Sequence, residues 1–146
     1  ILASNFSKRL GVYSFYIDDL HFNLAVRLLN DRYGIQVRGG CSCAGTYGHI
    51  LLNVAKEQSC IITTDINDGN LTTKPGWVRM SIHPTMTNAE VHYIMNAIEK
   101  LSENHKEWAA DYMYNNKTNE FMYKDKSFDL KNKDRAESWF KTQSLL

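Results

Sequence analysis

Residues 74–91, KPGWVRMSIHPTMTNAEV, contain a predicted strand followed almost directly by a predicted helix. Apolar and polar residues alternate over Trp77–His83, which is the period of a strand with one buried face. The apolar face carries Val78, Met80 and Ile82, and the other face carries Trp77, Arg79, Ser81 and His83. Pro84 ends the strand because it has no backbone N–H to donate. The segment is therefore predicted to be a strand with one apolar face.

The helix that follows this strand has a clear start signal. Thr87 and Glu90 form a T-x-x-E capping box, in which each side chain accepts a hydrogen bond from the other residue's backbone N–H. An apolar stripe with helical spacing follows, formed by Val91, Ile94, Met95, Ile98 and Leu101. We expect the helix to continue to about Tyr112.

Upstream, the pattern predicts strand, helix and strand in turn. Leu10–Ile17 is rich in β-branched and aromatic residues and is typical of a strand. Phe22–Tyr33 has leucines on one helical face and is followed by Gly34, a common helix stop. Ile35–Arg38 is then a short predicted strand.

The remaining segments add helices and a hairpin. Tyr47–Ala55 and Ser59–Asp68 are predicted helices, and Lys74–Gly76 has the residues of a type II turn. Residues 113–123 are typical of a small hairpin, and Ala136–Phe140 of the start of a terminal helix. The order predicts an α+β (α/β layered) domain with one small sheet covered by helices.

Composition narrows the class of protein. The chain has 146 residues, enough for one domain with a buried core, and a net charge of +1. That charge gives no reason to expect nucleic acid or an anionic membrane as a partner. The three cysteines cannot all pair internally, which favours a reducing compartment, and we expect a cytoplasmic protein. The sequence shows neither a signal peptide nor an apolar run of the roughly 18 residues that a membrane helix needs. A start at Ile1 suggests a fragment, a processed chain or a trimmed one.

Residues 38–45, RGGCSCAG, concentrate the groups that are capable of chemistry. Cys43 is a candidate nucleophile, because a nearby guanidinium or a histidine such as His49 would favour its thiolate. The alternative is a small buried residue in a tight loop. A C-x-C pair with one distant Cys60 lacks the spacing of a structural zinc site, so no metal is expected.

Arg79 and Arg38 are the candidate binding residues. Arg79 lies in mid-strand, where its guanidinium could bind a carboxylate through two parallel hydrogen bonds. The alternative for both arginines is an exposed sheet face or a structural ion pair. The sequence alone leaves both interpretations open.

Two blocks together resemble a known family. GIQVRGGCSCAGTYGH (residues 34–49) is similar to the cysteine-loop segment of class V aminotransferases, which include cysteine desulfurases and selenocysteine lyases. KPGWVRMSIHPTMTNAEV resembles the strand–helix block that follows in the same family. The likeness covers roughly residues 8–103 and implies the small C-terminal domain of a pyridoxal-phosphate enzyme. That domain has a small, mostly antiparallel sheet, as in aspartate-aminotransferase-like enzymes.

The resemblance also implies a set of roles. Arg79 matches the arginine that holds the substrate α-carboxylate, Arg38 an arginine near the active site, and Cys43 the desulfurase nucleophile. Pyridoxal 5'-phosphate would be bound mainly by a large domain of the same polypeptide, whose lysine lies outside this chain. We therefore expect residues 1–112 to form the small domain, 113–146 a hairpin and tail extension of it, and the parent enzyme to be a homodimer.

Two functions follow from these expectations. The parent enzyme acts on an amino acid by transamination, or by desulfuration of cysteine or selenocysteine with Cys43 as nucleophile, and the isolated chain is inactive. The alternative is an autonomous binding module without a catalytic role, since no position of the chain matches the cofactor lysine.

Overall fold

The structure is a computed structural model, and it describes most of the chain. The described residues are 1–2, 4–5, 8, 10–41, 45–125, 127, 133–135 and 137–138. Cys43 lies outside them, as does most of the terminal helix predicted over Ala136–Phe140. The described residues form ten helical and strand elements, and these follow the predicted order of types apart from an additional 3-10 turn before the hairpin.

The central sheet has three antiparallel strands in the order β1-β3-β2. β3 (Trp77–Ser81) lies in the middle, between β1 (Val12–Phe15) and β2 (Arg38–Gly40). Its residues Val78 and Met80 are buried, as the alternation in the sequence predicted. The expected α+β fold with a small antiparallel sheet is therefore confirmed.

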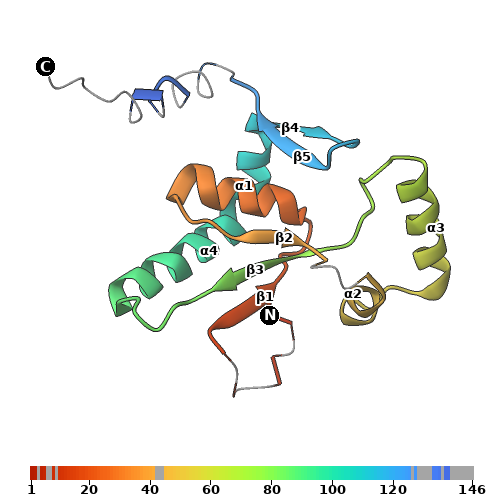
Figure 1. Cartoon of the computed structure of the whole chain (residues 1–146), viewed down its shortest axis with the longest axis horizontal. Coiled ribbons are helices and arrows are strands. Elements are labelled where there is room, and N and C mark those ends of the chain that lie inside the picture. Colours follow the sequence, from red (N-terminus) through yellow and green to blue (C-terminus); the bar gives the residue numbers. More distant parts are fainter. Residues whose placement is uncertain are drawn as a thin grey trace, which may run out of the picture.

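Two helices, α1 (Phe22–Tyr33) and α4 (Asn88–Trp108), supply the helical side of the core (Figure 1). The side chains with almost no exposed surface are Leu28, Leu29, Leu101 and Val78. Each buried leucine stabilises the fold by about 1.5–3 kcal/mol. These residues come from α1, α4 and β3, so the core joins both helices to the central strand.

The predicted capping box is present at the start of α4. The Thr87 hydroxyl accepts from the Glu90 backbone, and the Glu90 carboxylate accepts from the Thr87 backbone N–H at 2.7 Å. The Thr87 N–H and the Thr87 hydroxyl both donate to the Glu90 carboxylate, and these two bonds lower the pKa of Glu90 because they favour its charged form. The apolar stripe is narrower than expected: Ile94 and Leu101 are buried, whereas Met95 is 58% exposed.

A second sheet, the hairpin of β4 (Tyr112–Asn115) and β5 (Glu120–Tyr123), packs against α1. It follows α4 through a short 3-10 turn at Ala109–Asp111. The Tyr112 hydroxyl donates to Asp31 Oδ2 at 3.0 Å, and Arg27 Nε donates to the same oxygen at 2.7 Å. Burial, together with the hydrogen bond to Asp31, raises the pKa of Tyr112 well above its usual value. A neutral tyrosine therefore fastens the hairpin to α1.

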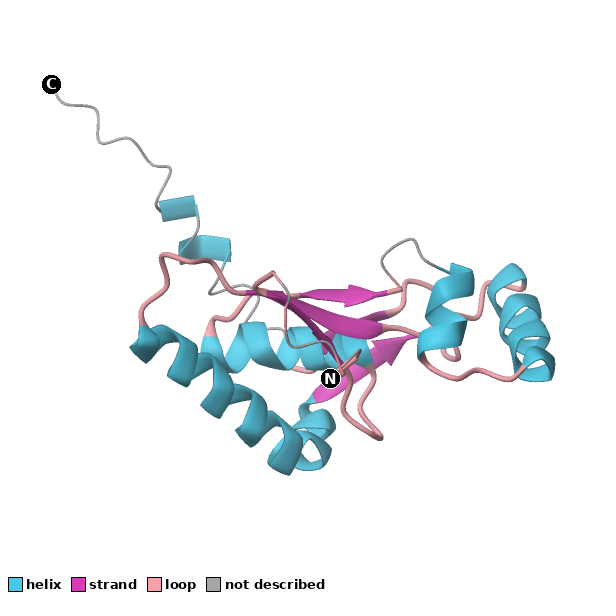
Figure 2. Ribbon diagram, turned by 90° about the horizontal axis from the view of Figure 1, so that it is seen from below, coloured by secondary structure: helices cyan, strands magenta, loops and turns pink. Residues whose placement is uncertain are grey.

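The other two helices, α2 (Gly45–Leu51) and α3 (Lys56–Asn67), lie beyond one end of the sheet, away from α4 (Figures 1 and 2). His49 Nδ1 and Ser59 Oγ share a hydrogen bond at 2.7 Å that links the two helices. Both helices begin earlier than their apolar patterns predicted, and the large apolar side chains of Tyr47, Ile50 and Ile61 are exposed.

Two local predictions were wrong. β2 covers residues 38–40 rather than Ile35–Arg38, because the N–H of Ile35 bonds to Leu29 in the C-terminal turn of α1. The segment at Gly76 is not a type II turn, since Gly76 lacks the positive φ that such a turn requires. Glycine is needed there for space instead: a Cβ would lie 2.6 Å from the Phe22 ring.

Candidate functional site

The register of the sheet brings the two candidate arginines together. Arg38 of β2 and Arg79 of β3 are directly paired, and Ser14 of β1 is the partner of Arg79 on its other side. Residues paired across strands point to the same face of a sheet, with Cβ atoms about 4.5–5.5 Å apart. We call Ser14, Arg79 and Arg38 the arginine row. It lies on the face opposite the buried Val78 and Met80.

The arginine row places two positive charges side by side. Within the described part of the chain, neither Arg38 nor Arg79 forms an ion pair. Arg38 is exposed and Arg79 is half-buried, so both can be reached from solvent. Like charges directly opposite each other destabilise a sheet, and an anion bound between them would remove this cost. A guanidinium can bind a carboxylate or a phosphate group through two parallel hydrogen bonds.

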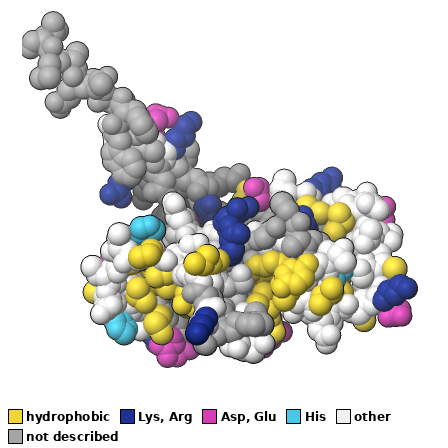
Figure 3. All heavy atoms as spheres, turned by 60° about the horizontal axis from the view of Figure 1, so that its bottom comes forward, with side chains coloured by type: hydrophobic (Ala, Val, Ile, Leu, Met, Phe, Trp, Pro, Cys, Tyr) yellow, Lys and Arg dark blue, Asp and Glu magenta, His cyan; other side chains and the backbone are white. Residues whose placement is uncertain are grey.

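One end of the arginine face is closed by α2. Two residues along the strands, the next pair on the same face is Gly40 and Trp77, and Trp77 is buried. Gly48 of α2 lies so close that a Cβ there would be 3.1 Å from the indole ring. Figure 3, which brings the lower side of Figure 1 forward, shows basic side chains between apolar groups on this side of the molecule. Trp77 and α2 therefore form an apolar border at this end of the arginine face.

The cysteine part of the site is only partly described. Cys43 lies outside the described residues, so its role as nucleophile stays a prediction. Cys41, which follows β2, is half-buried. The hydrogen bond of His49 to Ser59 directs its Nδ1 toward α3. Among the described residues, no three histidine, cysteine or acidic side chains gather as metal ligands.

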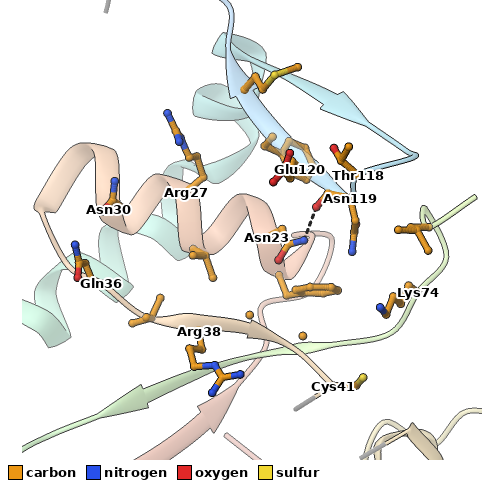
Figure 4. A pocket seen from close by; sticks show the side chains of 18 residues that line it. Asn23, Arg27, Asn30, Gln36, Arg38, Cys41, Lys74, Thr118, Asn119 and Glu120 are labelled. Carbon is orange, nitrogen blue, oxygen red and sulfur yellow. Dashed lines mark hydrogen bonds between the residues drawn. The ribbon is translucent and has the colours of Figure 1, made fainter. Parts of the chain in front are cut away.

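A groove of about 1120 Å³ runs along β2 on the side toward α1 and the hairpin (Figure 4). It is lined by one face of α1, by residues 36–41 and 118–122, and by Leu71 and Lys74. The side chain of Asn23 donates to the backbone carbonyl of Asn119 across it. The same Asn119 accepts from the Tyr114 hydroxyl at 2.9 Å, which fixes the hairpin end of the groove.

Two features of these sites were missed by sequence reasoning. Ser14 was treated only as part of a strand, because its pairing with Arg79 depends on a register that one sequence does not encode locally. The hairpin was expected to be an extension, yet its residues 118–122 line the groove. A weak signal in the sequence for the role of the hairpin was Phe121, an apolar residue that packs against the core.

Comparison with known proteins gives one match. The family model "Aminotransferase class-V" matches residues 1–94, which include β1, β2, β3 and the whole arginine row. No curated protein and no solved structure gives a significant match. In the described part of the chain, no helix is both long enough and apolar enough to cross a membrane.

Proposed function

The chain belongs to the class-V aminotransferase family, and from this we propose that it is the small domain of a pyridoxal-phosphate enzyme acting on an amino acid. The observation that carries the proposal is the arginine row. Arg38 and Arg79 lie side by side on one face of the sheet, with no acidic partner among the described residues. In this role the row binds the α-carboxylate of the substrate. Arg79 provides the bidentate contact, Arg38 a second positive charge and Ser14 a hydroxyl donor.

The described residues are suited to binding the carboxylate of the substrate rather than the cofactor. The family generally uses pyridoxal phosphate, which, when bound, withdraws electrons from the substrate Cα. The three strands of the sheet contain no lysine, and Trp77 is their only buried residue on the arginine face. We therefore assign the cofactor to a large domain of the same polypeptide, and only carboxylate binding to this chain.

The exposed surface around the row supports a partner domain. Tyr47 and Ile50 of α2 are 58% and 70% exposed, and Val12 of β1 is 42% exposed. A large domain packed over these side chains would bury them and exclude water from the arginines, which strengthens the bond to a carboxylate. The expected homodimer and the cytoplasmic location are further parts of this proposal.

The carboxylate role is tested first on the chain itself. L-alanine is titrated into isotope-labelled chain, with L-alaninamide as the ligand that lacks a carboxylate. We expect L-alanine alone to shift the side-chain Nε–H signals of Arg79 and Arg38 in NMR spectra. Arg79→Gln should abolish the shift, whereas Arg32→Gln, at an arginine stacked on Trp108 outside the row, should leave it unchanged. Equal shifts with both ligands would contradict the proposal.

The reaction is tested in the full polypeptide. Arg79→Ala should raise KM for the amino acid by about 100-fold, because a charge-assisted bond to the substrate is lost. Cys43→Ser then separates the two reactions, since desulfuration needs the thiol and transamination does not. Unchanged KM in the Arg79 variant would favour a binding module without catalysis.

A further inference from the structure

The groove beside β2 runs along strand edges and not over strand faces. Six consecutive residues, 36–41, line one side of it, and five consecutive residues, 118–122, line the other. Neighbouring residues of a strand point to opposite faces, so an unbroken run can line a groove only along an edge. No residue of β4 belongs to the lining.

Both edges are unpaired within the described residues. β2 is the last strand of its sheet and pairs only with β3, while β5 pairs only with β4. No other backbone hydrogen bond is made by residues 38–40 or 120–122 of the described chain. Unpaired N–H and C=O groups along a strand edge form a template for another extended chain.

The floor of the groove is one face of α1. Its lining residues Phe22, Asn23, Val26, Arg27 and Asn30 follow helical spacing. A Cβ at Gly39 would lie 3.0 Å from side-chain atoms of three of them, so glycine lets β2 lie close against the helix. The groove is therefore bordered by α1, by β2 and by the hairpin, and the bond from Asn23 to Asn119 ties the helix to the hairpin (Figure 4).

The charges of the lining favour an acidic occupant. The lining carries three cationic side chains, Arg27, Arg38 and Lys74, and a single acidic one, Glu120. Asp31 neutralises Arg27, but Lys74 has no ion-pair partner among the described residues. Lys74 is held in place because its backbone bonds to Leu71, whose own N–H bonds to the hairpin at Asn116.

We propose that this groove binds an extended acidic peptide, which adds a strand to the free edge of β2 and places a carboxylate near Lys74. Backbone pairing supplies the affinity, as in other cases of strand addition, and the charge selects acidic sequences. The groove and the proposed carboxylate site share Arg38, but Arg79 lies outside the lining of the groove, so variants at Arg79 and Lys74 distinguish the two sites.

The test uses the whole chain and three synthetic octapeptides. One alternates β-branched and acidic residues, the second has the same sequence with alternate amides N-methylated, and the third replaces the acidic residues by lysine. We expect the first to bind, to slow hydrogen exchange at β2 amides, and to shift β2 and β5 signals in NMR spectra. N-methylation on the pairing side and the basic replacement should each weaken binding by about tenfold or more.

Matched variants separate this proposal from the previous one. Lys74→Glu should abolish the preference for the acidic peptide, whereas Lys56→Glu, at an exposed residue of α3 outside the groove, should not. Arg79→Gln should leave peptide binding unchanged while it abolishes L-alanine binding. Equal affinity for the N-methylated peptide would overturn strand addition. Signal shifts of the groove on concentrating the chain alone would assign it to a second copy and also overturn the proposal.

Discussion

Single residues in this chain are constrained by close contacts that the sequence does not reveal. Gly76 is an example. Its φ does not lie in the left-handed region, but the Phe22 ring beside it leaves no room for a Cβ. His21 is another: its Nδ1 accepts from the backbone of Asn23 at 3.1 Å, and its ring stacks on Phe22 at 4.4 Å between centroids. Gly76 and His21 both contact Phe22, the first residue of α1, and so fix the N-terminal end of this helix.

Gly76→Ala should destabilise the chain by about 1–3 kcal/mol, because the new methyl group would lie within 3 Å of the Phe22 ring. Urea unfolding measures the loss. The cost should be smaller when the same change is made in a Phe22→Leu background, where the ring is absent. An equal cost in both backgrounds would show that the strain does not come from this contact.

His21 should make the chain sensitive to acid. Burial lowers the pKa of His21 below its ordinary value of 6.5, and the Asn119 side chain offsets part of this shift. Below pH 6.5 the unfolded chain therefore takes up a proton that the folded chain resists, so stability falls as the pH decreases. Above pH 6.5 this contribution is constant.

Unfolding of His21→Asn by urea at pH 5.5 and 7.5 checks this prediction. Asparagine keeps a helix-capping side chain but does not titrate, so the variant should lose less stability at the lower pH than the parent. His92→Asn, at an exposed histidine of α4, should behave like the parent. A parent-like loss in the His21 variant would contradict the assignment.

At the scale of elements, the hairpin depends on a small polar network. Asp31 accepts from both Tyr112 and Arg27, and its side chain is only 8% exposed. Tyr112→Phe should cost about 1 kcal/mol, since it removes one hydrogen bond and leaves the aspartate paired with arginine. Hydrogen exchange should speed up in β4 and β5 more than in β3. Tyr123→Phe is the comparison within the same hairpin, and a uniform change over all strands would contradict a local role.

Sequence patterns predicted elements well where local signals were strong. The bounds of α1 were predicted correctly, because its leucine spacing and Gly34 agree with each other. The strand at β2 was placed three residues too early, because Ile35 and Val37 look like strand residues but the backbone at Ile35 is used to end α1. Its true residues, Arg38–Gly40, have little strand propensity and depend on pairing with β3.

At the scale of the whole molecule, the two paired arginines lower the stability of the free chain but form the proposed binding site for a carboxylate. Arg38→Gln should stabilise the free chain by about 0.2–1 kcal/mol, because it removes a like charge opposite Arg79. It should also weaken L-alanine binding. Urea unfolding and the NMR titration check both effects, with Lys56→Gln as a charge-matched control. A loss of stability in the Arg38 variant would show that this arginine has a structural partner instead.

The sequence by itself determined the family, the α+β class and the alternating faces of β3, because these depend on motifs and on short-range periodicity. It also singled out Arg38 and Arg79 as candidates. Only the tertiary structure decided that these two residues are neighbours, since the pairing of β2 with β3 joins segments about forty residues apart in the chain. The groove likewise exists only because α1 holds two unpaired strand edges on either side of it, and packing between distant elements is not written in any local pattern.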